Sequence, residues 1–300
     1  MKLKPQEFAE LTNYIYKACG LSIGNEKQYL VEQRLFNLAK TAGGGSFQGL
    51  IDKLKTGADP RLRDDVIEAM TTNETSFFRD GHPFDTFRDK LLPILEQTII
   101  QRKKSPIQRR GAKVRIWSAA ASTGQEAYSM AMLIHEHVKA NGHKGVTVED
   151  FDILATDISS SVLAQAISGR YSDMEMARGL SAERRDRFFT KTDSGWAVGH
   201  DLQSIVEFRR INITEPFTAL GGFDVIFCRN ILIYFDDDTK RKIMRQMHQM
   251  LSPAGYLLLG ACENVQGMGV DFESITHKST ILHRVRQAGS GADAKVAVKR

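Results

Sequence analysis

Residues 114–140 read VRIWSAAASTGQEAYSMAMLIHEHVKA, and the nature of the fold follows from this stretch. Its first residues have the apolar content of a buried strand, the next few are small, and the rest has the length of a helix. A strand that passes through a turn of small residues into a helix is typical of a parallel α/β sheet. The stretch therefore predicts an α/β domain that begins near residue 113.

The same alternation continues towards the C-terminus. Further strands are expected at FDILATD (151–157), IVEFRRINI (205–213), FDVIFC (223–228) and YLLLGACE (256–263), and SITHKSTILHRVR (274–286) is typical of an antiparallel hairpin. Residues 170–204 interrupt this alternation. We expect a doubly wound α/β domain over residues 113–286, with residues 170–204 as a small β-subdomain insertion.

The chain before residue 113 favours helices. Helical spacing of apolar residues over 6–18, 25–40, 46–57 and 60–73 predicts a small helical domain within residues 1–80. A longer helix is expected from His82-Pro83, and Pro93 is predicted to kink or divide it. Residues 81–112 are read as this helix and a linker. The tail over 287–300, rich in Gly, Ala and Lys, is predicted to be disordered.

The net charge is +5, from 41 Lys and Arg against 36 Asp and Glu. Basic residues cluster in one segment, at Arg102, Lys103, Lys104, Arg109, Arg110, Lys113 and Arg115. A nucleic-acid patch is one reading of this segment. Ser105-Pro106, Gly111 and the absence of interleaved aromatic residues favour a solvated linker instead, and no nucleic-acid partner is expected.

Other features point to a soluble cytoplasmic protein. No apolar run reaches the roughly 18 residues that span a bilayer, and the N-terminus does not read as a signal peptide. The three cysteines show no spacing typical of a metal site, so no metal is expected. Cys228 and Cys262 fall in strand-like segments and are expected to be buried thiols. A monomer is the default expectation.

Small or polar residues follow several of the predicted strands. These are AAASTG (119–124), Asp157, Asn212 and the pair Arg229-Asn230. Ligands of doubly wound sheets bind beyond the carboxyl ends of the strands, where an acid such as Asp157 accepts hydrogen bonds from ribose hydroxyls. Taken singly, AAASTG is also a common tight turn and Asp157 a helix N-cap. Taken together they favour a cofactor that contains a nucleoside.

The chain contains neither G-x-G-x-x-G nor G-x-x-x-x-G-K-[ST], the motifs that bind pyrophosphate or triphosphate groups. A nucleoside cofactor without a pyrophosphate fits better, and S-adenosylmethionine is the obvious choice.

Five segments of the chain form a longer pattern: TTNETSFFRD (71–80), WSAAASTGQEAYSMA (117–131), ATDIS (155–159), INITE (211–215) and CRNILIYF (228–235). Together these segments resemble the CheR family of chemotaxis receptor methyltransferases. The resemblance covers nearly the whole chain. It implies a helical receptor-recognition domain before a Rossmann-like methyltransferase domain, and methyl transfer from S-adenosylmethionine to glutamate side chains of a chemoreceptor, with S-adenosylhomocysteine as product.

The resemblance also implies roles for individual residues. Arg79 lies close to the reacting centre, and Tyr234 faces the transferred methyl group. The residues implied to contact the cofactor are Asn73, Thr75, Arg79, Glu126, Asp157, Asn212, Ile213, Arg229 and Asn230.

Two segments depart from the family pattern. The chain reads GACEN at 260–264, where members often read GHSEN, so Ala261 and Cys262 stand in place of that His-Ser pair. The segment TKTDSGWAVGHDL (190–202) is shorter than in relatives whose glycine-rich loop binds the C-terminal tail of a receptor. This chain resembles the tether-independent kind, and the tail peptide is not expected to bind.

Lys27, Arg34 and Lys40 lie on or beside one predicted helix, and the partner coiled coil is rich in glutamate. We expect these cations to bind the receptor by charge complementarity, although a solvated helix face is the simpler alternative. A nucleic-acid or small-molecule methyltransferase is an alternative activity, but no Asn/Asp-Pro-Pro-aromatic turn is present. A catalytically silent scaffold that binds receptors is the alternative from outside the enzymes.

Overall fold

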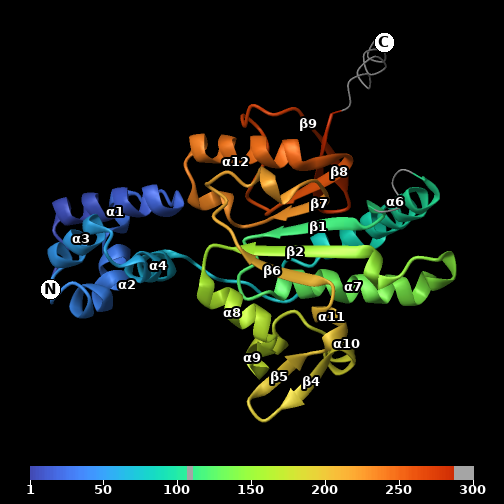
Figure 1. Cartoon of the computed structure of the whole chain (residues 1–300), viewed down its shortest axis with the longest axis horizontal. Helices are drawn as coiled ribbons and strands as arrows, with labels where there is room; N and C mark the ends of the chain where they lie inside the picture. The colour runs from blue at the N-terminus through green and yellow to red at the C-terminus, as the bar shows by residue number, and fades with distance from the viewer. Residues whose placement is uncertain (107–110, 287–300) are drawn as a thin grey trace, which may run out of the picture.

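The computed structural model describes residues 1–106 and 111–286 (Figure 1). In Figure 1 a group of N-terminal helices lies at one side of a larger α/β part, and a small insertion with its own sheet projects from that part. The predicted tail and the basic residues Arg109 and Arg110 lie outside the described residues.

The N-terminal part consists of the helices α1 (Pro5–Cys19), α2 (Gln28–Thr41), α3 (Phe47–Thr56) and α4 (Pro60–Met70), with a short 3-10 turn at Asn25–Lys27. In α1, Phe8, Leu11 and Ile15 recur at intervals of three and four, so they share the buried face. Pro5 begins this helix, and Gly20 ends it with φ +73°. The amphipathic pattern therefore produces a helical domain with its own core.

A second helical segment connects the two parts. It is divided into α5 (His82–Thr86), a π-helical turn at Phe87–Leu91 and α6 (Leu92–Lys104). Pro93 has no N–H to donate to the preceding turn, and the Leu92 amide bonds to Phe87 O, five residues earlier. Pro93 thus follows a widened turn, and the predicted division of this helix lies there.

The main sheet has seven strands in the order β6-β2-β1-β7-β8-β10-β9. The strands β1 (Val114–Ala119), β2 (Phe151–Asp157), β6 (Val206–Arg210), β7 (Phe223–Cys228) and β8 (Leu251–Leu259) are parallel to one another. The strands β9 (Phe272–His277) and β10 (Thr280–Val285) form the antiparallel hairpin, and β10 is also antiparallel to β8. The chain moves outward from β1 to β2 and β6, then returns to the other side of β1 at β7. A crevice is expected where this order reverses.

Helices cover both faces of the sheet. In Figure 1, α12 (Asp237–Met250) lies on one side of the strands, and α7 (Gln125–Asn141) lies on the other, as does α8 (Ser160–Ser168). Neighbouring residues of β1 belong to different cores: Ile116 packs in the core that contains α7, and Trp117 in the core that contains α12. Burial on both faces explains why the central strands β1, β2 and β7 are mostly apolar, whereas the edge strand β6 is not.

The insertion has a three-stranded sheet in the order β3-β5-β4. Its elements are β3 (Arg170–Tyr171), α9 (Asp173–Ala177), α10 (Ala182–Phe188), β4 (Phe189–Thr192), β5 (Gly195–Val198) and α11 (His200–Gln203). The strands β4 and β5 are joined by Asp193 and Ser194 alone. The segment 190–202 therefore folds as a tight hairpin followed by a short helix.

Polar and steric contacts hold the N-terminal helices against the α/β part. The Glu68 carboxylate of α4 accepts hydrogen bonds from the Ser161 hydroxyl at 2.6 Å and the Ser161 amide at 3.1 Å, so α4 caps the N-terminus of α8. A Cβ added at Gly20 would lie 2.6 Å from Thr214 Cγ2, in addition to the strain of a left-handed conformation. The two parts are thus packed closely where α1 ends.

Two expectations from the sequence need correction. The strand β8 begins at Leu251 and ends at Leu259, so GACE lies beyond it and Cys262 is exposed, whereas Cys19 and Cys228 are buried. The basic segment is not a solvated linker throughout. Its side chains contact groups at the opposite end of the strands from their carboxyl ends: Arg102 pairs with Asp224, Lys103 with Asp150 and Lys113 with Asp152, and Arg115 donates to Leu220 O and Gly222 O.

Candidate active site

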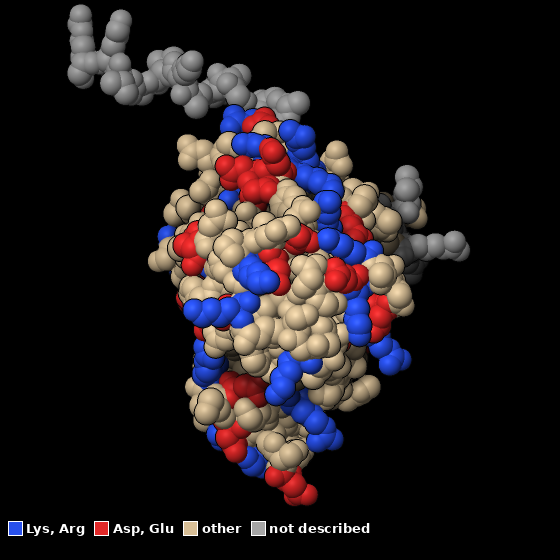
Figure 2. Space-filling view, turned by 90° about the vertical axis from the view of Figure 1, so that its left-hand side faces the viewer, with Lys and Arg blue, Asp and Glu red and all other residues tan. Residues whose placement is uncertain are grey.

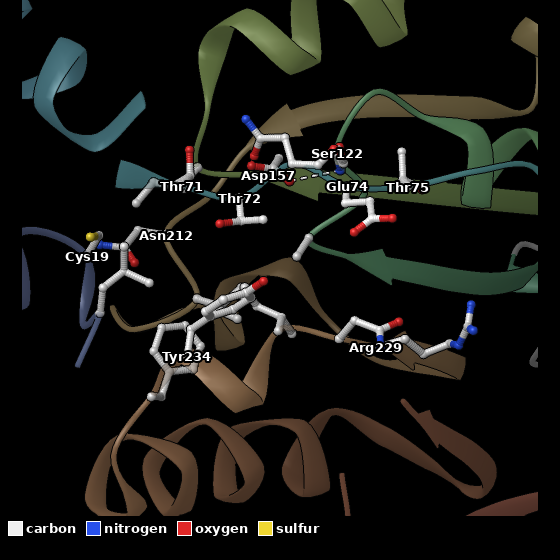
Figure 3. Close-up of a pocket in the computed structure, with 18 of the residues that line it drawn as sticks. Cys19, Thr71, Thr72, Glu74, Thr75, Ser122, Asp157, Asn212, Arg229 and Tyr234 are labelled. Atoms are coloured by element: carbon white, nitrogen blue, oxygen red, sulfur yellow. Dashed lines mark hydrogen bonds between the residues drawn. The ribbon is translucent and has the colours of Figure 1, made fainter. Parts of the chain in front are cut away.

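A pocket lies at the carboxyl ends of β1, β2, β6 and β7, between the sheet and the N-terminal helices (Figure 3). It is lined by every residue that the resemblance implies for the cofactor and the reaction: Asn73, Thr75, Arg79, Glu126, Asp157, Asn212, Ile213, Arg229, Asn230 and Tyr234. Most of these residues come from segments after separate strands, which meet because parallel strands end at the same edge of the sheet, whereas Asn73, Thr75 and Arg79 come from the linker after α4.

Asp157 is buried at the end of β2. One carboxylate oxygen accepts the Ser122 amide at 2.9 Å, the dashed line in Figure 3, and the other accepts the Ser159 amide at 3.0 Å. Burial raises the pKa of Asp157, and the backbone hydrogen bonds oppose this shift. Each ionised oxygen has a further lone pair, so Asp157 can also accept hydrogen bonds from a ligand.

Arg229 explains why a charged residue follows the apolar strand β7. Its guanidinium donates to Glu126 Oε2 at 2.9 Å, Asp80 Oδ2 at 2.7 Å and Arg79 O at 3.0 Å, and its side chain is 2% exposed. The other Glu126 oxygen accepts from the Ser118 hydroxyl at 2.7 Å. Arg229 therefore holds Glu126 and the segment at residues 79–80 against the end of the sheet. Its buried Nε has no hydrogen-bond partner among residues 1–106 and 111–286.

Backbone in the left-handed region concentrates around this pocket. Within residues 1–106 and 111–286, the non-glycine residues with positive φ are Phe78, Asp80, Ala120, Ser122, Asn230 and Lys278. Ala120, Ser122 and Asn230 line the pocket, and Phe78 and Asp80 flank Arg79. Such conformations are uncommon for these residues and gather at functional sites.

The linker after α4 forms one wall of the pocket. Ser122 Oγ donates to Asn73 O at 2.8 Å, which ties this linker to the turn after β1. Arg79 Nη1 donates to Glu74 O at 2.7 Å. Glu74 also pairs with Arg178 of the insertion at 3.2 Å, on the exposed side of the linker.

Tyr234 belongs to a turn that the N-terminal helical domain supports. Its carbonyl accepts the Ser22 amide at 2.9 Å, and Leu21 pairs with Phe235 as an isolated β-bridge. In Figure 3 the Tyr234 ring lies on the opposite side of the pocket from Asp157 and Glu74. The Tyr234 hydroxyl makes no hydrogen bond to any residue within 1–106 or 111–286.

None of the three cations expected to bind a partner lines this pocket. Lys27 and Lys40 are exposed. Arg34 is partly buried, because its guanidinium donates to Met70 O at 2.7 Å, Thr71 O at 3.1 Å and Thr72 Oγ1 at 3.0 Å. These carbonyls end α4, so Arg34 caps that helix beside the pocket wall.

The sequence reasoning included Ala120 and Ser122, as part of AAASTG, but missed other residues that line the pocket. The missed residues are Cys19, Leu21, Met70, Thr71, Thr72, Glu74, Ile158, Ile211, Ile231 and Phe235. Ile158 and Ile211 lie just after predicted or observed strands, so their positions beside the carboxyl ends of the strands could have indicated them. Cys19, Leu21 and Met70 carry no local signal, because only the packing of the helical domain brings them to the pocket.

The described part of the chain contains neither a metal site nor a membrane-spanning helix. No group of three or more His, Cys, Asp or Glu side chains there has the arrangement of a metal site. No described helix combines the length and apolar character needed to cross a membrane.

Comparison with known proteins agrees with this geometry. Residues 6–71 match the family model described as the CheR methyltransferase all-alpha domain, and residues 73–281 match that of the CheR methyltransferase SAM binding domain. Chemotaxis protein methyltransferase 1 of Pseudomonas aeruginosa is 40% identical over 274 residues, 91% of this chain and 95% of that protein. Chemotaxis protein methyltransferase 1 of Vibrio cholerae is 40% identical over 285 residues, 95% and 98% of the two chains. The chain therefore belongs to the CheR methyltransferase family, with S-adenosylmethionine as its cofactor.

Proposed function

We propose that this chain transfers the methyl group of S-adenosylmethionine to glutamate side chains in the cytoplasmic coiled coil of chemoreceptors. The observation that carries this proposal is that Arg79 and Tyr234 line the same pocket as the residues implied for the cofactor. The similar proteins are named chemotaxis protein methyltransferases, which supports the substrate class. We place the protein in the cytoplasm as a monomer.

The residues of the pocket fit this cofactor. When bound, S-adenosylmethionine supplies a methyl group on a sulfonium ion. Asp157, buried and with lone pairs left over, would accept the ribose hydroxyls. Glu126 would face the cationic amino group, held in place by Arg229. Arg229 Nε is a buried donor with no partner in the described part of the chain, so it would be available to the carboxylate of the cofactor.

The pocket suits a nucleophile that is already charged. A glutamate side chain has a reference pKa near 4.3, so at neutral pH it needs no general base, and no histidine is among the described residues that line the pocket. The remaining task is alignment of the carboxylate with the methyl group. Arg79 would orient the incoming carboxylate by its charge, and the free hydroxyl of Tyr234 would donate a hydrogen bond to it.

Two substitutions test these roles. Arg79→Ala and Tyr234→Phe should lower the turnover of receptor methylation by about 10- to 100-fold, while cofactor affinity changes less, because both groups act on the substrate in the transition state. Turnover is measured with radiolabelled cofactor on receptor-containing membranes, and cofactor affinity by calorimetry. A variant with wild-type turnover would remove the role of that residue.

We also propose that the receptor binds to helix α2. Tyr29 is 69% exposed and Phe36 is 39% exposed, and their spacing of seven residues places them on one face of α2. Lys27 precedes the helix and Lys40 lies near its end. Figure 2 views the molecule from this side and shows a largely uncharged area bordered by Lys, Arg, Asp and Glu side chains. Exposed aromatic rings flanked by lysines would suit an acidic amphipathic coiled coil.

The structure changes which cation should be tested. Reversal of the charge at Arg34 would also break its bonds to the end of α4, so a loss of activity would not identify a receptor contact. Lys27→Glu and Lys40→Glu are cleaner. They should slow methylation, and the wild-type rate should fall as salt rises. Lys139→Glu on α7 is the matched control and should be neutral. Equal rates for all three variants would contradict docking through α2.

We also propose that the receptor tail is not a binding partner. The two-residue turn between β4 and β5 supports this, because it leaves no long loop to hold a peptide. A receptor that lacks its last few residues should be methylated as fast as the full-length receptor. Calorimetry with the isolated tail peptide should detect no binding, and tight binding would overturn this part of the proposal while leaving the methyltransferase activity intact.

A further inference from the structure

The Glu263 carboxylate binds a run of backbone amides in the turn that carries Tyr234. Oε2 accepts the amides of Gly260 at 2.7 Å and Asn230 at 2.8 Å. Oε1 accepts the amides of Ile231 at 2.9 Å and Leu232 at 2.7 Å, and that of Ile233 at 3.4 Å. One side chain thus satisfies amides on two segments about thirty residues apart.

The shape of the turn produces this concentration of donors. Asn230 has a φ of +58°, and the 3-10 helix at Leu232–Tyr234 follows it, so successive amides point towards one place. An anion is the natural partner of such an arrangement. Glu263 supplies it from the loop after β8, and Glu263 is not among the residues that line the pocket.

The turn contributes directly to the pocket. Asn230, Ile231, Tyr234 and Phe235 all line it. Without the carboxylate, the amides of residues 230–232 would have no acceptor, and the turn would lose the contacts that define its conformation. The position of the Tyr234 ring therefore depends on a residue that touches neither substrate nor cofactor.

Gly260 provides independent evidence that this contact is built closely. A Cβ added there would lie 2.6 Å from Glu263 Oε2 and 2.8 Å from the Asn230 amide nitrogen. Only glycine leaves the carboxylate room to reach the turn. Ala261 and Cys262 are exposed. The departure from the family pattern at 260–264 thus falls on the two exposed positions, and the two residues in contact with the turn, Gly260 and Glu263, are unchanged.

We propose that Glu263 is a positioning residue for methyl transfer, which holds the turn at residues 230–234 so that Tyr234 faces the reacting centre. This inference rests on the proposed role of Tyr234. The amide of Glu263→Gln would keep one acceptor oxygen and direct an NH₂ group at backbone N–H donors, so about half of the hydrogen bonds would be lost. Glu263→Asp would keep the charge and both oxygens and should restore part of the activity.

The experiment measures turnover, cofactor affinity and thermal unfolding for the full chain. Glu263→Gln should lower kcat by about 10- to 100-fold, with a smaller change in KM for the receptor, since hydrogen bonds to a charged group are strong. Gly260→Ala should act in the same direction as a second variant. The matched control is the neighbour Cys262→Ala, which should have wild-type turnover.

A double substitution separates positioning from general destabilisation. If Glu263 acts through Tyr234, the variant Tyr234→Phe with Glu263→Gln should be about as slow as Tyr234→Phe alone. Fully additive losses, or wild-type kcat in Glu263→Gln beside an impaired Tyr234→Phe, would overturn the inference and leave the proposed function standing. Wild-type kcat in Tyr234→Phe would instead refute the proposed role of Tyr234, and the inference about Glu263 with it.

Discussion

The substitution Arg229→Met tests whether the ion pairs of Arg229 stabilise the pocket. Methionine fills a similar volume, so Arg229→Met removes charge and hydrogen bonds without opening a large cavity. The side chain of Arg229 is 2% exposed, and that of its partner Glu126 is 13% exposed. Asp80, the other acidic partner, is 38% exposed and is therefore well screened by water.

The expected loss of stability follows from this difference in exposure. Removal of one partner from a buried ion pair destabilises a protein by about 3–5 kcal/mol, because the other charge stays buried without compensation. Glu126 keeps its hydrogen bond from Ser118, and Asp80 is solvated, so we expect the low end, about 3 kcal/mol. Cofactor affinity should fall about tenfold, equivalent to about 1.4 kcal/mol, because Glu126 loses the group that orients it.

Urea unfolding measures the first quantity and calorimetry with S-adenosylmethionine the second. Arg79→Met is the matched control for stability. Within the described residues the side chain of Arg79 makes a single hydrogen bond, to Glu74 O, and its replacement should change the unfolding free energy by less than about 0.5 kcal/mol. Wild-type stability in Arg229→Met, combined with a large loss of cofactor affinity, would contradict a structural role for this ion pair. The guanidinium would then act mainly on the cofactor, as the family resemblance implies.

Two further predictions concern single carboxylates. Asp157→Asn should weaken cofactor binding by roughly 1.5–3 kcal/mol, because one of its acceptor oxygens is replaced by an NH₂ donor beside a backbone amide. If calorimetry shows unchanged affinity in a folded variant, Asp157 does not bind the ribose. The hydrogen bond from Arg88, followed by that from Lys278, lowers the pKa of Asp89 to about 2. The pKa of Asp89 in the folded state therefore lies below its unfolded value near 3.8. The contacts of Asp89 with Arg88 and Lys278 stabilise the protein fully above pH 3.8, and this stabilisation is lost as the pH falls through about 2. Because 30% of the Asp89 side chain is exposed, we expect Asp89→Asn to be less stable than the wild type by only about 1 kcal/mol at pH 7. In unfolding experiments this difference in unfolding free energy should become smaller below pH 4. A difference that stays constant with pH would contradict the prediction.

Ligands of doubly wound sheets bind beyond the carboxyl ends of the strands, and this rule predicts much of the site from local sequence alone. Asp157 ends one apolar strand and Arg229-Asn230 follow another, Asn212 follows the edge strand β6, and the carboxyl ends of parallel strands must share one edge of the sheet. The rule works because a strand and the residue after it span less than ten positions of the chain. The resemblance added Arg79 and Tyr234, which also line the pocket.

Local periodicity in the amino-acid sequence was sufficient to predict the alternation of strands and helices, the helical character of the N-terminal part and the residues at the strand ends. Which distant groups meet became known only from the packing of the folded chain. Arg229 pairs with Asp80 across 149 residues, and Glu263 reaches the turn at residue 230 across 33. The N-terminal helices contribute Cys19, Leu21 and Met70 to the pocket. No periodicity specifies such contacts, since they arise from how whole elements pack against one another.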